Sequence, residues 1–138
     1  MACSMPAVLL VEDNPNDIEL TLLALETGKC GNRIDVVRNG AEALEYLFRR
    51  GDFTDRDPTE EPRVILLDIK LPLVNGIDVL REIKADKRTR HLPVVILTSS
   101  GEDRDLAACY ALGANSYIVK PVDVDGFFEA IRQVGLYW

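Results

Sequence analysis

The chain has 138 residues, which is the size of one compact domain and leaves no room for a second. Apolar residues make up 47% of the chain and charged residues 28%, a composition that excludes a largely disordered protein. Asp and Glu number 23 against 16 Lys and Arg, so the formal net charge is −7. This balance argues against nucleic acid or an anionic membrane as the main partner, because both require a basic face.

The sequence carries no sign of export or membrane insertion. No stretch approaches the roughly 20 apolar residues that a membrane helix needs, and the N-terminus lacks the profile of a signal peptide. The three cysteines, Cys3, Cys30 and Cys109, are far apart and show no C-x-x-C spacing, which argues against disulfides and a zinc site. Cys109 is expected to be a small apolar residue of a helix. We therefore expect a cytoplasmic protein.

Five short apolar runs alternate with helical patterns along the chain. The runs are too short for core helices and rich in β-branched residues, so they predict strands. The predicted strands are Ala7–Val11, Ile34–Val37, Val64–Leu67, Val94–Leu97 and Ser116–Val119. The first, third and fourth are apolar without alternation, which indicates burial on both faces in a parallel sheet. The second contains Asp35, which suits an edge strand.

Capping residues and helical periodicity predict a helix after each strand. Asn14 can cap the first helix, with Pro15 at its first position and Gly28 as its stop. The other helices are predicted to begin near Asn39-Gly40, after Asn75-Gly76, near Glu102 and at Asp123. This βαβαβαβαβα order predicts an α/β protein, a flavodoxin-like three-layer sandwich whose five-stranded parallel sheet has the order 2-1-3-4-5. In the fifth helix, the adjacent Phe127 and Phe128 are not expected to face the same core.

One stretch, from Gly51 to Pro62, is linker-like and acidic. Its acid spacing misses the calcium-loop pattern, which needs a glycine and a closing glutamate in register. The stretch joins a helix to the start of a strand, so we expect a solvated loop at the far end of the sheet, available for a partner contact. The single histidine, His91, also precedes a strand and is expected to be a surface residue.

Polar residues follow four of the five strands at their carboxyl ends, where ligands bind in open parallel sheets. They are Glu12 and Asp13 after the first strand, Asp68 after the third, Thr98, Ser99 and Ser100 after the fourth, and Lys120 after the fifth. The predicted strand order brings the three acids together, where they would raise one another's pKa unless a cation lay between them. A small acidic oxygen site suits Mg²⁺. A carboxylate beside Mg²⁺ and a lysine is an arrangement for phosphoryl transfer with Asp as the nucleophile.

Each of these residues also has an ordinary explanation when it is taken alone. Glu12 and Asp13 could merely favour the start of a helix, and Asp68 could be a turn residue. Thr98 could be an ordinary strand residue and Lys120 an ordinary surface residue. Their joint location on the edge that the topology assigns to ligands is the stronger signal.

Four motifs together resemble the receiver domain of bacterial two-component response regulators. They are Val11-Glu12-Asp13-Asn14, Leu66-Leu67-Asp68-Ile69-Lys70-Leu71-Pro72, Ile96-Leu97-Thr98-Ser99 and Tyr117-Ile118-Val119-Lys120-Pro121. Within that family the chain looks most like the stand-alone, chemotaxis-regulator-like members that partner phytochrome-type histidine kinases. The pointers are Asn14-Pro15-Asn16-Asp17, the acidic insert before the third strand and Gly113-Ala114-Asn115-Ser116-Tyr117.

The resemblance implies a role for each matching position. Asp68 would accept a phosphoryl group from a kinase histidine, and Glu12, Asp13, Asp68 and the backbone carbonyl of Lys70 would hold Mg²⁺. Lys120, Thr98 and Ser99 would contact the phosphoryl group, Thr98 and Tyr117 would form the conformational switch, and Pro121 would follow a cis bond. Lys70 and Ser100 lie two positions after Asp68 and Thr98, so we expect them to tune the lifetime of the phosphoryl group. The family often has Asp-Asp where this chain has Glu12-Asp13, and Asp-Gly where it has Asn75-Gly76, which should affect only the turn.

The resemblance also implies how the signal leaves the protein and which partners it has. The printed chain stops soon after the fifth helix, so we expect residues 1–138 to form one receiver domain without an output domain, a signalling phosphoacceptor with no turnover substrate. The signal would leave by protein contact or onward phosphotransfer. The expected partners are a sensor histidine kinase, in particular a bacterial phytochrome, an unknown downstream protein, and a second copy bound through the face of helix four, strand five and helix five.

Three other functions fit the predicted fold less well. A binding module that is never phosphorylated would not need the full acid, Thr and Lys set. An aspartate-nucleophile hydrolase usually has a second Asp two positions after the first, where this chain has Lys70. A flavin carrier needs a Ser, Thr and Gly-rich phosphate loop after the first strand, where Glu12-Asp13 would repel a phosphate.

Overall fold

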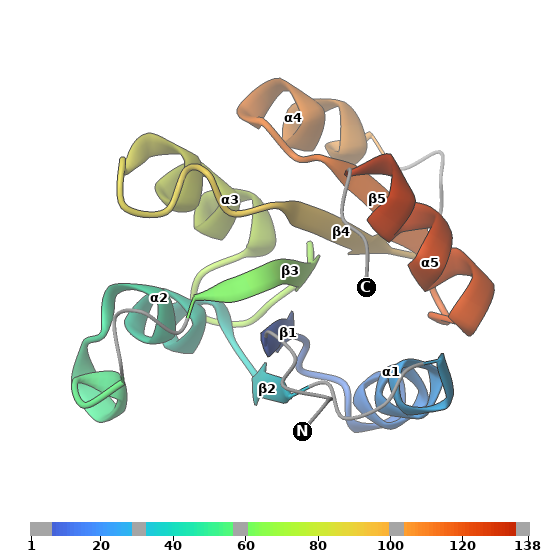
Figure 1. Ribbon diagram of the computed structural model, residues 1–138. Helices are drawn as coiled ribbons and strands as arrows, with labels where there is room; N and C mark the ends of the chain where they lie inside the picture. The colour runs from blue at the N-terminus through green and yellow to red at the C-terminus, as the bar shows by residue number, and fades with distance from the viewer. Residues whose placement is uncertain (1–6, 29–32, 57–60, 100–103, 135–138) are drawn as a thin grey trace.

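The computed structural model describes residues 7–28, 33–56, 61–99 and 104–134 (Figure 1). All five strands form one parallel sheet in the order β2-β1-β3-β4-β5, as the alternation of elements predicts. The strands are β1 (Ala7–Val11), β2 (Ile34–Val37), β3 (Pro62–Asp68), β4 (Val94–Thr98) and β5 (Ser116–Val119). β3 and β4 continue past their predicted ends because Asp68 pairs with Leu97 and Thr98 pairs with Val119. Two of the candidate site residues are therefore the last residues of central strands.

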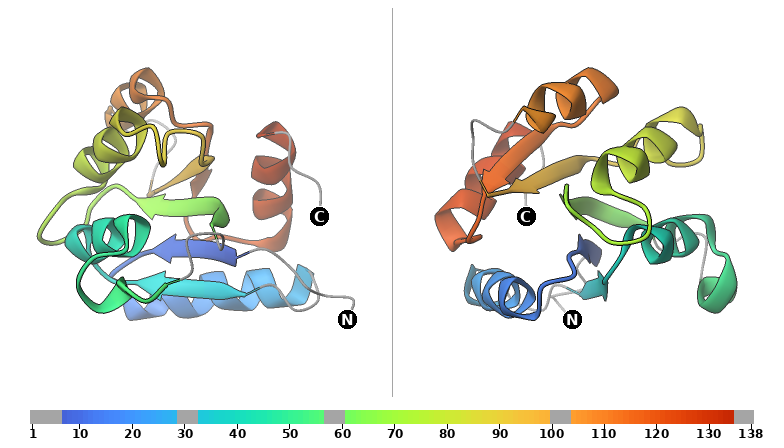
Figure 2. Two further views of the ribbon diagram at one scale, coloured as in Figure 1. Left: turned by 60° about the vertical axis from the view of Figure 1, so that its left-hand side comes forward. Right: turned by 180° about the vertical axis from the view of Figure 1, so that it is seen from behind.

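Helices cover both faces of this sheet and complete three layers (Figures 1 and 2). The helices are α1 (Pro15–Gly28), α2 (Gly40–Phe48), α3 (Gly76–Ala85), α4 (Asp105–Leu112) and α5 (Val124–Gln133). α1 and α5 pack on one face, and α2, α3 and α4 pack on the other. The helices begin close to their predicted starts, because Asn39, Asn75 and Asp123 accept the backbone N–H bonds of their first turns. None of the helices in the described ranges is long and apolar enough to span a bilayer.

Burial follows the position of each strand in the sheet. The described side chains of β1 and all those of β4 are buried, whereas the edge strand β5 alternates between buried and exposed side chains. Tyr117 and Val119 are its outward residues, 40% and 43% exposed. Cys109 is fully buried in the apolar cluster beneath α4, as expected for a small apolar residue. In the described residues the sheet is therefore shielded on both faces, and its side chains become exposed or partly exposed along the edge strands β5 and β2.

The structure corrects two expectations about local packing. Phe127 is in the core, and Phe128 is half-buried against the same apolar cluster, with the two ring centroids 5.8 Å apart. The two rings can share that cluster because a phenylalanine ring at the margin of a helix's apolar stripe is long enough to lean over it. The acidic stretch is not wholly a solvated loop. Gly51–Phe53 form a 3₁₀ turn whose Phe53 ring packs edge-on against Tyr46, 5.3 Å between centroids.

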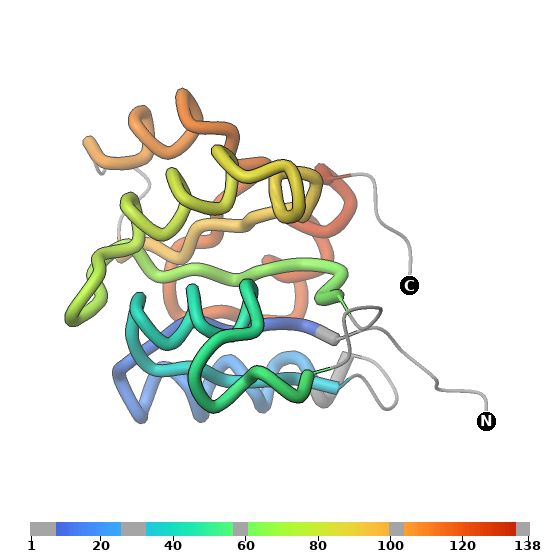
Figure 3. Tube along the Cα trace, turned by 90° about the vertical axis from the view of Figure 1, so that its left-hand side faces the viewer, coloured from blue at the N-terminus to red at the C-terminus, as the bar shows by residue number. Residues whose placement is uncertain are grey.

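The two ends of the sheet differ in chemistry. All strands run the same way, so the β1–α1 and β3–α3 loops lie together at the carboxyl end (Figure 3). His91 lies before β4 at the other end, where its Nε2 is 2.5 Å from an oxygen of Glu61, and its side chain is exposed as expected. Candidate site residues therefore converge at the carboxyl end, far from the histidine.

Candidate functional site

The end of β1 delivers a buried carboxylate to the site. Glu12 directly follows the strand and is fully buried, while Asp13 is exposed. The Glu12 backbone N–H donates to the Val37 carbonyl at 3.1 Å, which continues the pairing of β1 with β2. The backbone N–H of Asn14 donates to Oε2 of Glu12 at 3.2 Å. The strand thus ends with Glu12 held from both sides and directed inward.

Helix α1 begins immediately after this pair of acids. The side-chain oxygen of Asn14 accepts from the backbone N–H groups of Asn16 at 2.9 Å and Asp17 at 3.1 Å, which caps the helix as predicted. Asp17 is the third residue of the helix, and its backbone carbonyl accepts a bond from the Thr21 hydroxyl at 2.7 Å. The first turn is therefore well fixed, and it carries Asp17 to the rim of the site.

Asp68 ends β3 and is 5% exposed. Its Oδ1 accepts the backbone N–H of Lys70 at 3.3 Å, and the Lys70 side chain itself is exposed. The loop after β3 returns to form α3 so closely that a Cβ on Gly76 would lie 2.2 Å from the Asp68 carbonyl oxygen. Only glycine can occupy that position without moving the backbone that carries Asp68.

The three acids from β1 and β3 meet as the sequence predicts. Glu12, Asp13 and Asp68 each offer one carboxylate oxygen, and these atoms all lie within 4.8 Å of one another. They converge because β1 and β3 are hydrogen-bonded neighbours that end at the same sheet edge. Carboxylate oxygens are the ligands that a hard divalent cation such as Mg²⁺ prefers. These three residues are therefore chemically suited to hold that ion.

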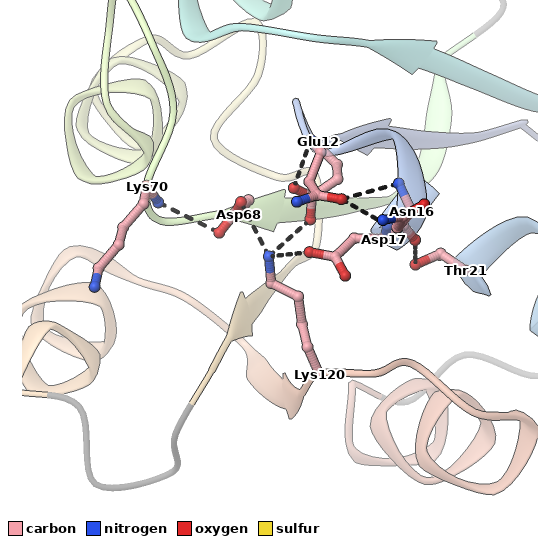
Figure 4. A network of polar contacts seen from close by, with 8 residues as sticks. Glu12, Asn16, Asp17, Thr21, Asp68, Lys70 and Lys120 are labelled. Carbon is pink, nitrogen blue, oxygen red and sulfur yellow. Dashed lines mark hydrogen bonds and ion pairs between the residues drawn. The ribbon is translucent and has the colours of Figure 1, made fainter. Parts of the chain in front are cut away.

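Lys120 directly follows the edge strand β5, and its side chain contacts three carboxylates (Figure 4). Its Nζ donates to Oε1 of Glu12 at 2.9 Å, to Oδ2 of Asp17 at 3.1 Å and to Oδ2 of Asp68 at 3.2 Å. Burial by itself lowers the pKa of Lys120, but the hydrogen bond to Glu12 and the charge of Asp68 outweigh it, so the pKa lies above its ordinary value. Lys120 is therefore a cation held in place by acids.

The electrostatics of Glu12 reflect its burial more than its neighbours. The pKa of Glu12 is raised to about 7, and the largest cause is desolvation by burial. The hydrogen bond from Lys120 lowers this pKa, and contact with Asp68 raises it. Mutual repulsion among the acids, which the sequence predicts, is thus present but secondary. An additional divalent cation would relieve both effects by supplying positive charge to a buried carboxylate.

Beside Asp68 lies a small open pocket of about 140 Å³. Its lining includes Asp68, Lys70, Thr98, Ser99 and Lys120. Thr98 is only 2% exposed at the end of β4, whereas Ser99 is exposed. A small group attached to Asp68 would lie among two lysines and two hydroxyl residues. Ser100 lies outside the described residues.

The remaining predicted residues lie on or after β5. The Tyr117 side chain is exposed, and its ring meets Tyr110 of α4 edge-on, with centroids 6.4 Å apart. The peptide bond between Lys120 and Pro121 is cis, the geometry that the resemblance implied. Tyr117 thus lies outside the pocket in this structure, on the face formed by α4 and β5.

Sequence reasoning overlooked two residues that shape this site. It used Asp17 only as part of the motif Asn14-Pro15-Asn16-Asp17, and it treated Asn75-Gly76 only as the start of a helix and a turn. The motif Asn14-Pro15-Asn16-Asp17 gives no sign that Asp17 reaches Lys120, more than one hundred positions away. The role of Gly76 depends on how closely α3 returns to β3, which a glycine in a turn motif does not reveal.

The chain is similar in sequence to known proteins. Residues 8–132 match the sequence model of the response regulator receiver domain. The probable methanogenesis regulatory protein FilR2 of Methanothrix harundinacea is 37% identical over 95% of this chain and 82% of its own length. The response regulator Rcp1 of Synechocystis is 32% identical over 95% of this chain and 87% of its own length.

Solved structures give the same result. The bacteriophytochrome response regulator RtBRR superposes with a TM-score of 0.89 at 50% identity, covering 97% of this chain and 80% of that one. The bacteriophytochrome response regulator AtBRR superposes with a TM-score of 0.90 at 49% identity, covering 98% and 96%. The Mn²⁺-bound form of Rcp1 gives 0.78 at 32% identity, covering 96% and 94%. Because its sequence matches the family model over nearly its whole length and its fold matches those of these structures, the chain belongs to the response regulator receiver domain family, the signalling phosphoacceptors of two-component systems.

Proposed function

We propose that Asp68 is the residue that accepts the phosphoryl group, from a phosphorylated histidine of a sensor kinase. The observation that carries this proposal is that Asp68 alone belongs both to the cluster of acids and to the small pocket. Neither Glu12, which is fully buried, nor Asp13 lines that pocket. Asp68 is therefore the carboxylate best placed to meet an incoming phosphorus atom.

The transfer requires little covalent chemistry from the protein. One oxygen of Asp68 forms a bond to phosphorus while the P–N bond to the donor imidazole breaks. The electron pair of that bond stays on the imidazole, which leaves neutral because its other nitrogen carries a proton. Glu12, Asp13, Asp68 and the backbone carbonyl of Lys70 would hold Mg²⁺, which when bound supplies positive charge for the phosphoryl oxygens. Lys120, Thr98 and Ser99 line the space that those oxygens would enter.

The proposed switch couples Thr98 to Tyr117. The phosphoryl group would draw the Thr98 hydroxyl toward it, and Tyr117 would turn from its present exposed position into the space that Thr98 leaves. Conversion from mostly off to mostly on needs about 5.5 kcal/mol in favour of the active state. A few charge-assisted hydrogen bonds of about 1.5–3 kcal/mol each supply that amount.

Lys70 is proposed to tune how long the phosphoryl group lasts. Its side chain is exposed and lines the pocket beside Asp68, where water must enter to hydrolyse the phosphoryl group. Ser100 has the corresponding position after Thr98 but lies outside the described residues. Hydrolysis rates of the wild type and Lys70→Asn should differ, and identical lifetimes would remove this role.

The proposed kinase is of the bacterial phytochrome type, and the proposed location is the cytoplasm. The support is the similarity to RtBRR and AtBRR, two bacteriophytochrome response regulators at about half identity over nearly the whole chain. Output would follow by protein contact or onward phosphotransfer from residues 1–138 acting as one receiver domain.

A second copy of the chain is proposed to bind through α4, β5 and α5. Tyr110, Tyr117 and Val119 expose apolar surface there, at 45%, 40% and 43%. Sedimentation at several concentrations, in both phosphorylation states, tests this contact. A monomer under every condition would contradict it.

Intact-mass analysis tests the central proposal. The protein is incubated with Mg²⁺ and a small phosphodonor, and wild type is compared with Asp68→Asn. We expect one added phosphoryl group on the wild type and none on the variant. Equal labelling of both proteins would assign the acceptor to another residue.

A further inference from the structure

We propose that Asp17 is a positioning residue that holds Lys120 in the resting state and opposes its transfer to the phosphoryl group. This inference rests on the proposed function, because it assumes that Lys120 contacts a phosphoryl group on Asp68. Asp17 thereby sets how strongly the resting site resists phosphorylation.

The ammonium of Lys120 has no hydrogen-bond donor to spare. It carries three N–H groups, and it makes three bonds, one each to Glu12, Asp17 and Asp68 (Figure 4). A phosphoryl oxygen can accept a hydrogen bond from this ammonium only if one of the three carboxylates gives up its own hydrogen bond. The three carboxylates therefore compete directly with the phosphoryl group.

Asp17 differs from the other two carboxylates in being outside the metal cluster. Glu12 and Asp68 belong to the group of acids that could share a cation, and a cation there would take over part of their charge. Asp17 keeps its full charge whether or not the cluster is filled. It is consequently the partner of Lys120 that metal binding does not release.

The contact is not a by-product of helix capping. An acid at the third helical position commonly accepts the backbone N–H of the capping residue. Here that N–H, on Asn14, donates to Glu12 instead, and the Asp17 carboxylate reaches Lys120 at 3.1 Å. The first turn fixes the Asp17 backbone through Asn14 and Thr21, so the side chain is presented to Lys120 by a rigid element.

Charge also makes Asp17 an opponent of the phosphoryl group. Asp17 and Asp68 bond to the same nitrogen, so they lie within two hydrogen-bond lengths of each other. A phosphoryl group adds negative charge at Asp68. At such a separation, removal of one partly solvated charge is expected to strengthen the binding of an anion about fivefold.

The test measures the affinity for trifluoroberyllate, an anion that mimics a phosphoryl group on a carboxylate. Beryllium and fluoride are titrated into the protein at saturating Mg²⁺, and binding is followed by amide chemical shifts. Asp17→Asn should bind about five times more tightly than wild type. Asp17→Glu, which keeps the charge, should bind as wild type does. Glu19→Gln removes a charge from the same helix at an exposed position and should stay within twofold of wild type.

Failure of this inference differs from failure of the proposed function. If the wild type does not bind the anion, or if Asp68→Asn binds equally well, the proposed function is wrong and the inference falls with it. If wild type binds and Asp17→Asn has equal or weaker affinity, the opposing role of Asp17 alone is overturned. The free energy of unfolding is measured without fluoride in parallel, because a purely structural Asp17 would change stability but not anion affinity.

Discussion

Replacing Lys120 with methionine tests whether this cation holds the acidic site together. Methionine keeps most of the side-chain volume but removes the charge that neutralises two nearly buried carboxylates, the side chains of Glu12 at 1% exposure and Asp68 at 8%. Loss of one partner from a buried ion pair costs about 3–5 kcal/mol. The contact to Asp17, at 29% exposure, adds about 0.5 kcal/mol.

We expect Lys120→Met to lose about 3 kcal/mol of unfolding free energy, the lower end of that range, because Glu12 can take up a proton when its partner is gone. For a chain of this length, that loss corresponds to a fall of about 10 °C in Tm. The measurement is urea unfolding in a chelating buffer near pH 8. Lys87→Met, at an exposed lysine, is the matched control and should change stability by less than about 0.5 kcal/mol.

Added Mg²⁺ should restore much of what Lys120→Met loses. In the wild type the ion competes with the ammonium for Glu12 and Asp68, whereas in the variant these acids are free to bind it. At 100 times its Kd, a ligand stabilises the folded state by about 2.7 kcal/mol. The reasoning is refuted if Lys120→Met unfolds as the wild type does, or if Mg²⁺ stabilises the variant no more than the wild type.

Three further substitutions probe the scaffold. Gly76→Ala should lower the free energy of unfolding by at least about 2 kcal/mol and weaken Mg²⁺ binding, because its Cβ would displace the Asp68 backbone. An unchanged Mg²⁺ affinity in titration calorimetry would contradict this. Leu73→Gly should stabilise the protein by about 1 kcal/mol in urea unfolding, since Leu73 is 81% exposed and has a φ of 69°; a loss of stability would contradict it. Burial, then the bond to Asp35, raises the pKa of Tyr46 to about 12. Relative to Tyr46→Phe, wild-type stability should therefore be constant below pH 10 and fall by about 2–3 kcal/mol between pH 10 and 12, and parallel pH profiles would exclude the shift.

The sequence by itself determined the elements and the edge at which the site lies. Apolar runs without alternation identify β1 and β4 as central strands, because a strand buried on both faces cannot alternate. Parallel topology then brings the carboxyl ends of neighbouring strands together, so Glu12, Asp13 and Asp68 could be grouped before any coordinate was known. These conclusions depend only on local periodicity and on a general rule of sheet connection.

Only the tertiary structure decided which hydrogen-bond partners the side chains at that edge have. Whether Asp17 caps its own helix or binds Lys120 depends on where the first turn of α1 lies relative to the end of β5. The outward position of Tyr117 and the close return of α3 at Gly76 likewise depend on packing between elements distant in sequence. Local patterns specify which face of an element is apolar, but shifts of an ångström between packed elements select hydrogen-bond partners.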